Sequence, residues 1–559
     1  MNIKRIYLAL AASIFMAGCS LDEKIYDTAM ANSFVQKESD IPFLLNGVYS
    51  YFSVYNSYKS NLNYQILCGG DDISSASATQ RLFLERTISS SNAYFTTPWL
   101  NFYLTINDAN ALLESMDKLE SISEGFKQRI QGELCFLRGF SYFNLVRLHG
   151  GVPIHTSSVY GKSDFYPSRN TIEEVYAQVF DDLKKAAESC LPYSKQPANE
   201  FGRATKGAAQ AMLALAYLTY GNYNDLKSNQ GEAAKYYQLA ENYADSVILS
   251  NEYSLLPNYA DLWNVNNEKN AHKEVIFSIQ HTRDATAASA SSRGSELPYY
   301  TQPTTRNAIC GNVTNGQGGG IMRIQPWFYD VCSTGDYVND YRTEVSFLTT
   351  WQNTLTNKAY ISYPRIRVTG SETVEQFPYM DKYRDPSGLQ ARNNENDFYI
   401  IRLSEVYLIK AEAENELNGP TPEAYAAFNK LRERARKANG IIRTTPANLA
   451  EGLTKEDFRM KIFDERGLEL VGEGHRWFDS VRMKYKDNTR TMIEYRYQDF
   501  LPAMAKTAPS YNTTTKVWGG GKVQPVNIVP YTDKFLIWPI PSSEIDANPN
   551  MTQNTEYGW

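Results

Sequence analysis

The chain contains 559 residues, with a formal net charge of −6 and a pI near 5.7. It has no run of lysine and arginine of the kind that follows a phosphate backbone, so its charge pattern argues against a nucleic-acid-binding protein. Tyrosine is abundant, at 40 residues. Its ring packs on apolar groups while its hydroxyl stays in water, which suits the recognition of amphipathic ligands. The length alone would allow about three or four domains, although helical folds often extend further as one unit.

The N-terminus has the pattern of a bacterial signal peptide. Lys4 and Arg5 precede an apolar run over residues 6–17, which is too short to cross a bilayer as a helix because about 20 residues are needed. The run ends in Met16-Ala17-Gly18-Cys19, which resembles a lipobox with Met where Leu is usual. We therefore predict a signal peptide over residues 1–18 and acylation of Cys19, so that lipid chains tether the mature protein. An ordinary secretory signal with a chance cysteine is the alternative.

Apolar residues recur at helical spacing in many segments of the mature chain. The predicted helices cover residues 33–58, 99–119, 125–149, 171–190, 205–220, 233–249, 399–417 and 423–437. Gly150-Gly151-Val152-Pro153 directly follows the third segment, and a glycine followed by proline is a typical helix stop. Gly221-Asn222 is predicted to turn the chain between the fifth and sixth helices. The fold class is therefore mainly α.

Two helical regions resemble each other. Residues 205–249 and 399–437 each contain a helix rich in Ala, Leu and Tyr, a turn with Gly or Asn, and a second helix with Ala and Tyr. This weak repetition is typical of tetratricopeptide helix pairs. Small residues let the helices approach closely, and each pair requires a neighbour to cover its apolar side. We expect three or four such pairs if residues 99–149 form one.

Three insertions interrupt the helical pattern, at about residues 59–98, 254–398 and 489–533. They are rich in Gly, Ser, Thr and Pro, and residues 316–320 are nearly all glycine. Short strands are predicted at residues 275–280 and 361–368. Irregular segments of this length are usually functional, so we expect a ligand-binding surface there.

Aromatic residues in the second insertion are the main candidate ligand contacts. The C–H faces of a sugar ring stack on flat aromatic rings, while amides, carboxylates or arginine bind its hydroxyls. We expect Tyr299, Tyr300, Trp351 and Tyr363 to provide such rings, with prolines stiffening the Tyr299-Tyr300 segment. Burial in the core is the alternative for each of them.

Polar candidates lie in the first insertion. A Gly-Gly pair is followed directly by Asp71 and Asp72, and Arg81 lies shortly after them. Their carboxylates and guanidinium could form bidentate contacts with the hydroxyls of a sugar.

Residues 462–482 contain the densest group of charged side chains. Glu465, Glu469 and Glu473 recur every four residues, so their Cβ atoms would lie about 5–6 Å apart on one helix face. A glycosidase requires two carboxyl groups on opposite sides of the scissile bond, which this arrangement does not provide. We therefore predict a structural role, with a helix beginning after Thr454. The expected partners are the nearby arginines Arg459, Arg466, Arg476 and Arg482.

The sequence contains no other recognisable catalytic or metal-binding pattern. There is no GxSxG, HExxH, GxxxxGK[ST] or CxxC motif, so no cofactor or metal is predicted. Of six cysteines, five remain after Cys19. We expect mostly free, buried thiols, with a Cys310–Cys332 disulfide as the alternative.

Several stretches, taken together, resemble the SusD/RagB-like family of outer-membrane glycan-binding lipoproteins. The matching motifs, in the order of the family, are residues 138–143 (RGFSYF) with 150–153 (GGVP), 402–407 (RLSEVY) with 411–413 (AEA), Glu465-Arg466 with 476–479 (RWFD), 539–541 (PIP) with Glu544-Ile545, and Gln553-Asn554. Two acidic residues soon after Cys19 also resemble the surface-export signal of Bacteroidetes lipoproteins.

The resemblance implies one domain over residues 19–559, in which tetratricopeptide-like helix pairs support irregular loops and a few short strands. It implies a protein on the outer membrane that faces the cell exterior. Family members cover a TonB-dependent transporter of the SusC type and deliver oligosaccharides to it. They also use the loop that contains Asp71, Asp72 and Arg81 for binding.

The expected function is therefore capture of an oligosaccharide without turnover. The alternative is a peptide-binding or structural surface scaffold of the tetratricopeptide type. The two differ in where the ligand contacts lie. A glycan site predicts exposed aromatic rings on the irregular segments, whereas a peptide scaffold predicts contacts on the helix faces.

Overall fold

The structure, a computed structural model, describes residues 35, 37–75, 77–119, 121–159, 166–283, 293–303, 318–352, 359–363, 377–386, 392–506, 510–512, 514, 517–519 and 525–559. The predicted signal peptide and Cys19 lie outside these residues. So do Cys310 and most of the strand predicted at residues 361–368. Those expectations stay predictions.

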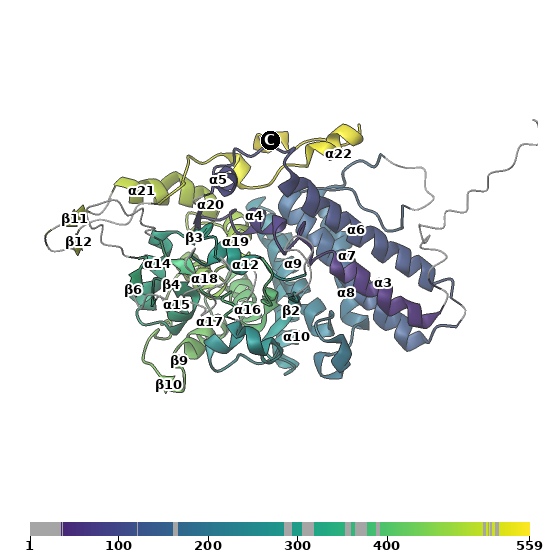
Figure 1. Ribbon diagram of the computed structural model, residues 1–559, viewed down its shortest axis with the longest axis horizontal. Coiled ribbons are helices and arrows are strands. Elements are labelled where there is room, and N and C mark those ends of the chain that lie inside the picture. The colour runs from purple at the N-terminus through teal and green to yellow at the C-terminus, as the bar shows by residue number, and fades with distance from the viewer. Residues whose placement is uncertain are drawn as a thin grey trace, which may run out of the picture.

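Long helices form the scaffold of the molecule (Figure 1). Successive helices pack against one another from α6 to α10 and onward to α16, while α17 and α18 both pack on α16. The scaffold helices are α3 (Ile41–Ser50), α6 (Ala93–Met116), α7 (Glu124–His149), α8 (Ile172–Ser189), α9 (Lys206–Leu226), α10 (Gln230–Leu249), α16 (Leu403–Asn418), α17 (Pro422–Ala435), α18 (Lys455–Glu469) and α19 (Arg476–Arg482). The mainly helical fold class is therefore confirmed. The pairs α9–α10 and α16–α17 correspond to two of the predicted helix pairs, and residues 99–149 form α6 and α7, which pack against each other.

Local sequence sets the ends of several helices. The Thr171 hydroxyl accepts a hydrogen bond from the Glu174 amide while the Glu174 carboxylate accepts one from the Thr171 amide, which forms a capping box at the start of α8. Thr454 caps α18 as predicted. Gly150 ends α7 with φ of +79°, a backbone conformation that glycine adopts without steric cost.

The predicted turn at Gly221-Asn222 is wrong. α9 continues to Leu226, and the chain turns over residues 227–229. A Cβ atom on Gly221 would lie only 2.7 Å from Cδ1 of Tyr237 on α10. The glycine therefore allows two helices to approach closely and does not end one.

The strands of the described residues form six two-stranded antiparallel sheets. The pairs are β1 (Ile73–Ser75) with β3 (Met322–Ile324), β2 (Val275–Ile279) with β8 (Phe398–Arg402), β4 (Phe347–Leu348) with β7 (Tyr379–Met380), β5 (Thr350–Gln352) with β6 (Ala359–Ile361), β9 (Lys437–Ala438) with β10 (Ile441–Ile442), and β11 (Ser510–Asn512) with β12 (Val517–Gly519). β2 confirms the strand predicted at 275–280. β8 occupies the start of the helix predicted at 399–417, because its buried isoleucines pair with β2 and the helix begins only at Leu403.

Short helices connect these parts. The α-helices are α4 (Asn61–Ile66), α5 (Ala78–Leu84), α11 (Glu268–Ala271), α12 (Leu297–Thr301), α14 (Pro326–Ser333), α15 (Tyr341–Ser346), α20 (Met492–Tyr495), α21 (Leu501–Lys506) and α22 (Ser542–Ala547). A π-helical turn, η7 (Arg496–Phe500), joins α20 to α21. Single 3₁₀ turns occupy Glu38–Asp40, Tyr193–Lys195, Ala198–Glu200, Tyr259–Trp263, Val265–Asn267, Gly335–Tyr337, Asp533–Phe535 and Thr555–Tyr557.

The three predicted insertions meet at one place. β1 from the first insertion pairs with β3 from the second. The side chain of Gln325, just after β3, exchanges hydrogen bonds with the backbone of Val526 from the third insertion. Asn527 also donates to the carbonyl of Ser75. We call this region the insertion face (residues 70–75, 293–303, 318–352, 359–363, 377–386 and 525–531). In Figure 1 it lies on the side of the molecule away from α3, α6 and α7.

One large apolar core extends from α3 to the C-terminal segment, with smaller clusters under α17–α18 and around Tyr259. Cys68, Cys135, Cys190 and Cys332 are free, buried thiols, as expected. None of the described helices is long and apolar enough to cross a membrane.

Candidate ligand-binding face

The carboxylates of residues 465–473 are buried structural groups. Glu465 and Glu469 lie on α18, whereas Glu473 follows in the turn after the helix. All three are at most 3% exposed and are ion-paired. The predicted partners are wrong: the carboxylates pair with Arg342, Arg402, Arg432, Arg434 and Lys382. The arginines named from the sequence pair elsewhere, Arg459 with Glu416, Arg466 with Glu405 and Asp479, Arg476 with Asp71, and Arg482 with Glu412 and Asp479.

Charges balance in this network. Its five cations, Arg342, Arg402, Arg432, Arg434 and Lys382, face five carboxylates, Glu274, Asp340, Glu465, Glu469 and Glu473. Burial alone would raise the pKa of Glu469, but Arg434, Arg402 and Arg342 outweigh it and hold that pKa well below the usual value. A carboxylate held charged by three arginines is already fully engaged, so the network stabilises the fold and offers no acid or base to a substrate.

Asp71 and Asp72 lie inside the protein. Asp71 is 1% exposed, and its carboxylate accepts hydrogen bonds from Arg476 at 2.8 Å and Arg496 at 2.6 Å. Burial raises its pKa, but the two arginines outweigh this and lower it to about 2. Burial raises the pKa of Asp72 to about 7, with Arg476 partly opposing it. Arg476 therefore joins residues 462–482 directly to the loop that contains Asp71.

Arg81 lies apart from these two residues. It is exposed and lies on α5, the short helix that follows β1. Of the three polar candidates, the structure therefore presents only Arg81 to solvent. A role in binding stays a prediction for all three.

Tyr299 and Tyr300 are neighbours on α12 with different environments. Tyr300 is buried, and its hydroxyl donates to Glu296 at 2.7 Å and lies 2.6 Å from the Ser60 hydroxyl. Tyr299 is half-buried, with the Arg392 guanidinium 4.3 Å from its ring centroid. A Cβ atom on Gly319 would lie 2.9 Å from Cζ of Tyr299. Tyr299 thus reaches the surface with part of its ring already covered.

Trp351 and Tyr363 lie near the β5–β6 hairpin. The Trp351 ring is half-buried and meets Tyr379 edge-to-face at 6.2 Å. Tyr363 is 7% exposed, and its hydroxyl donates to the Asp330 carboxylate at 2.9 Å. Trp351 is therefore the more accessible of the two rings.

Contacts between neighbouring segments connect Tyr299 to Trp351. The Ile321 amide, just before β3, donates to the carbonyl of Tyr300 on α12. β3 lies beside β7, where the Ile324 amide donates to Pro378, and Tyr379 of β7 contacts Trp351. Both rings therefore lie on connected segments of the insertion face, and their role in ligand binding stays a prediction.

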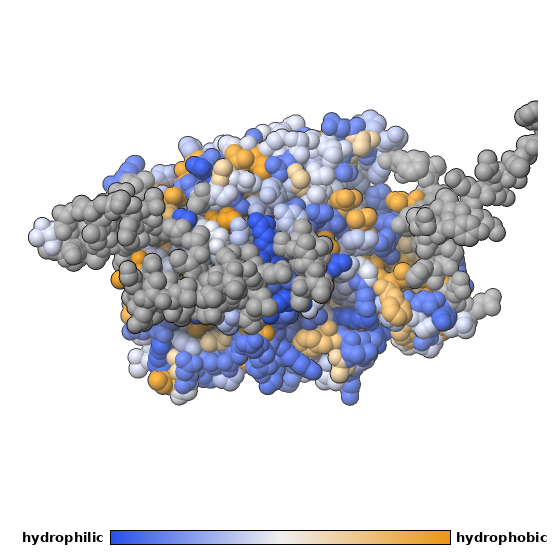
Figure 2. Space-filling view, viewed as in Figure 1, coloured by the Kyte–Doolittle hydropathy of each residue, from blue (hydrophilic) through white to orange (hydrophobic). Residues whose placement is uncertain are grey.

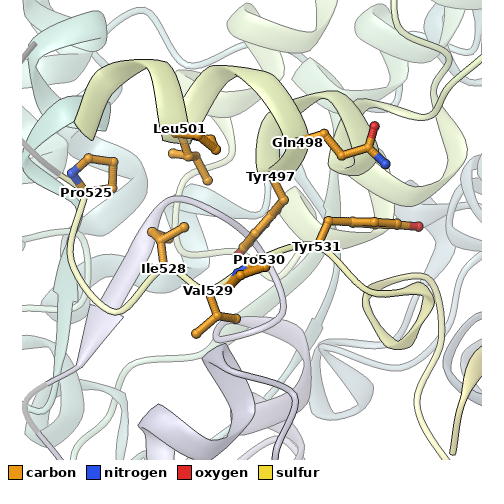
Figure 3. Close-up of a pocket in the computed structure, with 9 residues that line it drawn as sticks. Tyr497, Gln498, Leu501, Pro525, Ile528, Val529, Pro530 and Tyr531 are labelled. Carbon is orange, nitrogen blue, oxygen red and sulfur yellow. The ribbon is translucent and has the colours of Figure 1, made fainter. Parts of the chain in front are cut away.

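A pocket of about 520 Å³ opens at the edge of this face (Figure 3). The helical residues Tyr497, Gln498 and Leu501 lie on one side of it, and the segment from Pro525 to Tyr531 lies on the other. Tyr497 donates to the carbonyl of Gly70, so the pocket adjoins the Asp71 loop. Tyr531 was not among the residues predicted from the sequence, although an aromatic residue beside a proline within a predicted insertion is the same signal that identified Tyr299.

Other kinds of site are not supported in the part of the chain that the structure describes. No group of three or more His, Cys, Asp or Glu there could hold a metal ion. On the visible face of the space-filling view, apolar residues lie in small groups separated by hydrophilic ones (Figure 2). The coloured part of this view therefore shows no single broad apolar patch.

Comparison with known proteins decides the family. The SusD family model matches residues 273–559, just over half of the chain, and a second model, described as starch-binding associating with outer membrane, matches residues 21–218. The chain belongs to the SusD family. This is a family of binding proteins without enzymatic activity, associated with the outer membrane.

Individual relatives agree with this assignment. The chain is 30% identical to SusD-like protein P2 of Formosa agariphila, over 84% of this chain and 88% of the relative. A crystal structure of a SusD homolog from Bacteroides thetaiotaomicron has a TM-score of 0.78 and 22% identity, and the match covers 95% of this chain and 98% of that one. A laminarin-binding SusD-like protein has a TM-score of 0.67 and 23% identity, over 93% and 100% of the two chains.

The motifs that suggested the family join distant parts of this SusD-family protein. Arg138 on α7 pairs bidentately with Asp182 on α8. The Gln553 side chain exchanges two hydrogen bonds of 2.8 Å with the backbone of Ile540. The Asn554 amide donates to the carbonyls of His149 and Trp538. The motifs therefore specify the scaffold, and they do not by themselves identify a ligand.

Proposed function

We propose that the protein is a cell-surface lipoprotein that captures an oligosaccharide and delivers it to a SusC-like, TonB-dependent transporter. One observation carries the proposal. Three irregular insertions meet on one face, and each brings polar groups or a half-buried aromatic ring, with Tyr299, Trp351 and Tyr531 coming from three different segments.

Trp351 is the best stacking ring among these three. The Arg392 guanidinium already covers part of the Tyr299 ring. A ligand at this position would therefore contact Arg392, whose side chain is 33% exposed. Trp351 has a larger ring and contacts its neighbour Tyr379 edge-to-face rather than face-to-face. A sugar ring can therefore stack on the indole while amides and Arg392 bind its hydroxyls.

The relatives support this ligand class. A laminarin-binding protein and a surface glycan-binding protein share the fold. Acylation at Cys19, exposure on the cell exterior and delivery to a transporter complete the proposal. They follow from the lipobox pattern and from membership in the family.

The test is binding of the purified protein to a panel of oligosaccharides. Trp351→Ala and Tyr531→Ala should each weaken binding of the best glycan by about tenfold or more, the equivalent of about 1.4 kcal/mol. The control is Phe43→Ala, since Phe43 is a 75% exposed ring on α3, away from the insertion face. Normal binding by both test variants would refute the proposed site, and hydrolysis of any glycan would contradict a pure binding function.

A second candidate is peptide binding on the helices, because rings also line α8–α10. Tyr223, Tyr236 and Tyr243 are half-buried there, and Tyr236 and Tyr243 each stack on Tyr217 at 5.9 and 5.7 Å. Tetratricopeptide pairs present such surfaces to extended segments. If Tyr236→Ala impairs ligand capture and Trp351→Ala does not, the helix surface is the functional one.

A further inference from the structure

A second pocket, of about 540 Å³, lies between α3, the loop at residues 199–203 and β2. We call it the α3–β2 pocket. None of the aromatic rings proposed above lines it. It differs from the pocket at the insertion face because charged and amide side chains line it together with three phenylalanine rings, Phe52, Phe201 and Phe277.

His281 brings an unpaired acceptor to this pocket. Its side chain is 6% exposed, and Nδ1 lies 3.0 Å from the carbonyl of Arg293. A carbonyl only accepts, so Nδ1 must carry the proton. Burial lowers the pKa of His281 to about 4, so the ring is neutral at pH 7 and Nε2 is a bare acceptor. No donor among the described residues reaches Nε2, and a buried acceptor left unpaired destabilises the fold unless a ligand supplies the donor.

Arg203 supplies a matching donor. Its Nη2 donates to the side chain of Asn46 at 2.9 Å. Its buried Nη1 makes no hydrogen bond within the described part of the chain and lies 3.5 Å from the Glu200 carboxylate. His281 and Arg203, which both line the pocket, therefore each hold a buried polar atom that makes no hydrogen bond to the described residues.

The charges that line the pocket cancel. The cations Arg203 and Arg293 balance the carboxylates Glu200 and Asp397. Asp397 is engaged by the Ser278 hydroxyl and the His281 amide. Burial, reinforced by the charge of Asp397, raises the pKa of Glu268 to about 9, so Glu268 is protonated at pH 7. Because the charges of the lining sum to zero, a charged ligand would gain no net electrostatic attraction in this pocket. The lining therefore does not favour a charged ligand over a neutral one.

We propose that the α3–β2 pocket is a second carbohydrate site, which holds one or two neutral sugar units. One sugar hydroxyl donates to Nε2 of His281, another accepts from Nη1 of Arg203, and the C–H face packs on the half-buried ring of Phe201. The volume falls within the range of small-molecule pockets and suits a saccharide of this size. The choice of a sugar as ligand rests on the proposed function, but the location is independent of it.

The test measures binding of glucose, galactose, mannose, xylose and their neutral disaccharides by saturation-transfer NMR and calorimetry. It uses the full protein carrying Trp351→Ala, in which the insertion face is impaired. At least one of these sugars should still bind with millimolar affinity. His281→Asn, whose amide can retain the donor to the Arg293 carbonyl but which lacks Nε2, should then weaken that binding by about tenfold or more.

A second variant guards against misfolding at His281. Ser53 is half-buried and lines the pocket, so Ser53→Phe should fill it and abolish the same binding. Absence of binding to any of these sugars in the Trp351→Ala protein would overturn the proposal, as would normal binding in both pocket variants. If long glycans bind the native protein but none of the small sugars binds the Trp351→Ala protein, the second site is refuted while the proposed function stands.

Discussion

Replacement of Arg402 by methionine tests whether the carboxylate-rich segment is structural. Arg402 is fully buried and donates to Glu274 at 3.0 Å, to Glu469 at 2.5 Å and to Glu473 at 2.8 Å. Its removal leaves four cations against five carboxylates in the network. Breaking a buried ion pair from one side costs about 3–5 kcal/mol. We therefore expect Arg402→Met to lower the free energy of unfolding by about this amount at pH 7.

The loss should depend on pH with a defined sign. Glu469 and Glu473 both have pKa values below 4.5, because their basic partners outweigh the effect of burial. Groups of this kind contribute stability above their unfolded pKa, near 4.5, and lose it as the pH falls through the folded pKa. The difference between native and variant proteins should therefore be full at pH 7 and shrink as the pH falls below about 4.5.

Urea unfolding followed by circular dichroism at several pH values measures both effects. The matched control is Arg490→Met, since Arg490 pairs with Asp487 and Asp499 at the surface and such pairs contribute about 0–1 kcal/mol. Arg402→Met combined with Glu473→Gln restores equal charge numbers and should recover part of the loss. If Arg402→Met costs no more than the control, or impairs glycan binding at unchanged stability, the structural reading of the network is refuted.

Three further predictions concern single side chains. Tyr300→Ala should destabilise the protein by about 3–5 kcal/mol because the ring is fully buried, whereas Tyr299→Ala should change the free energy of unfolding by less than about 1.5 kcal/mol; equal losses in urea unfolding would contradict the different environments seen on α12. Trp477→Phe removes the hydrogen bond from Nε1 to the carbonyl of Phe535 and leaves that buried acceptor unpaired, which should cost about 1–3 kcal/mol; a neutral result would show that Phe535 is otherwise satisfied. Asp72 has a pKa raised to about 7 by burial, so its protonated form contributes stability that is lost as the pH rises through that value; Asp72→Asn should therefore gain stability relative to the native chain between about pH 4 and pH 8, and parallel pH curves would disprove the shift.

Family motifs were readable in the sequence because they are short and local. Arg138, Arg466 and Asn554 were recognised by their neighbours along the chain, without knowledge of what they contact. The structure shows that each one ties together segments that are distant in sequence. Recognition of the family therefore preceded any account of why these residues are needed.

Pairing of charges could not be read in the same way. The four arginines nearest to the carboxylates in sequence were the expected partners, but Arg342, Arg402 and Arg434 on other elements are the ones that reach Glu469. Asp71 and Arg476 are 405 positions apart and form one ion pair. Such contacts depend on how elements pack, and periodicity along one helix carries no information about them.

The sequence by itself determined most of the scaffold helices, the cap at Thr454, the stop at Gly150, the positions of the irregular insertions, and the family. Each of these depends on local signals: apolar period, capping residues, glycine stops and short motifs. Only the tertiary structure decided which candidate residues face solvent. Tyr299 and Tyr300 are adjacent and chemically identical, yet one reaches the surface and the other is buried against Ser60 and Glu296. The physical reason is that burial is set by neighbours from distant segments, which the order of residues does not reveal.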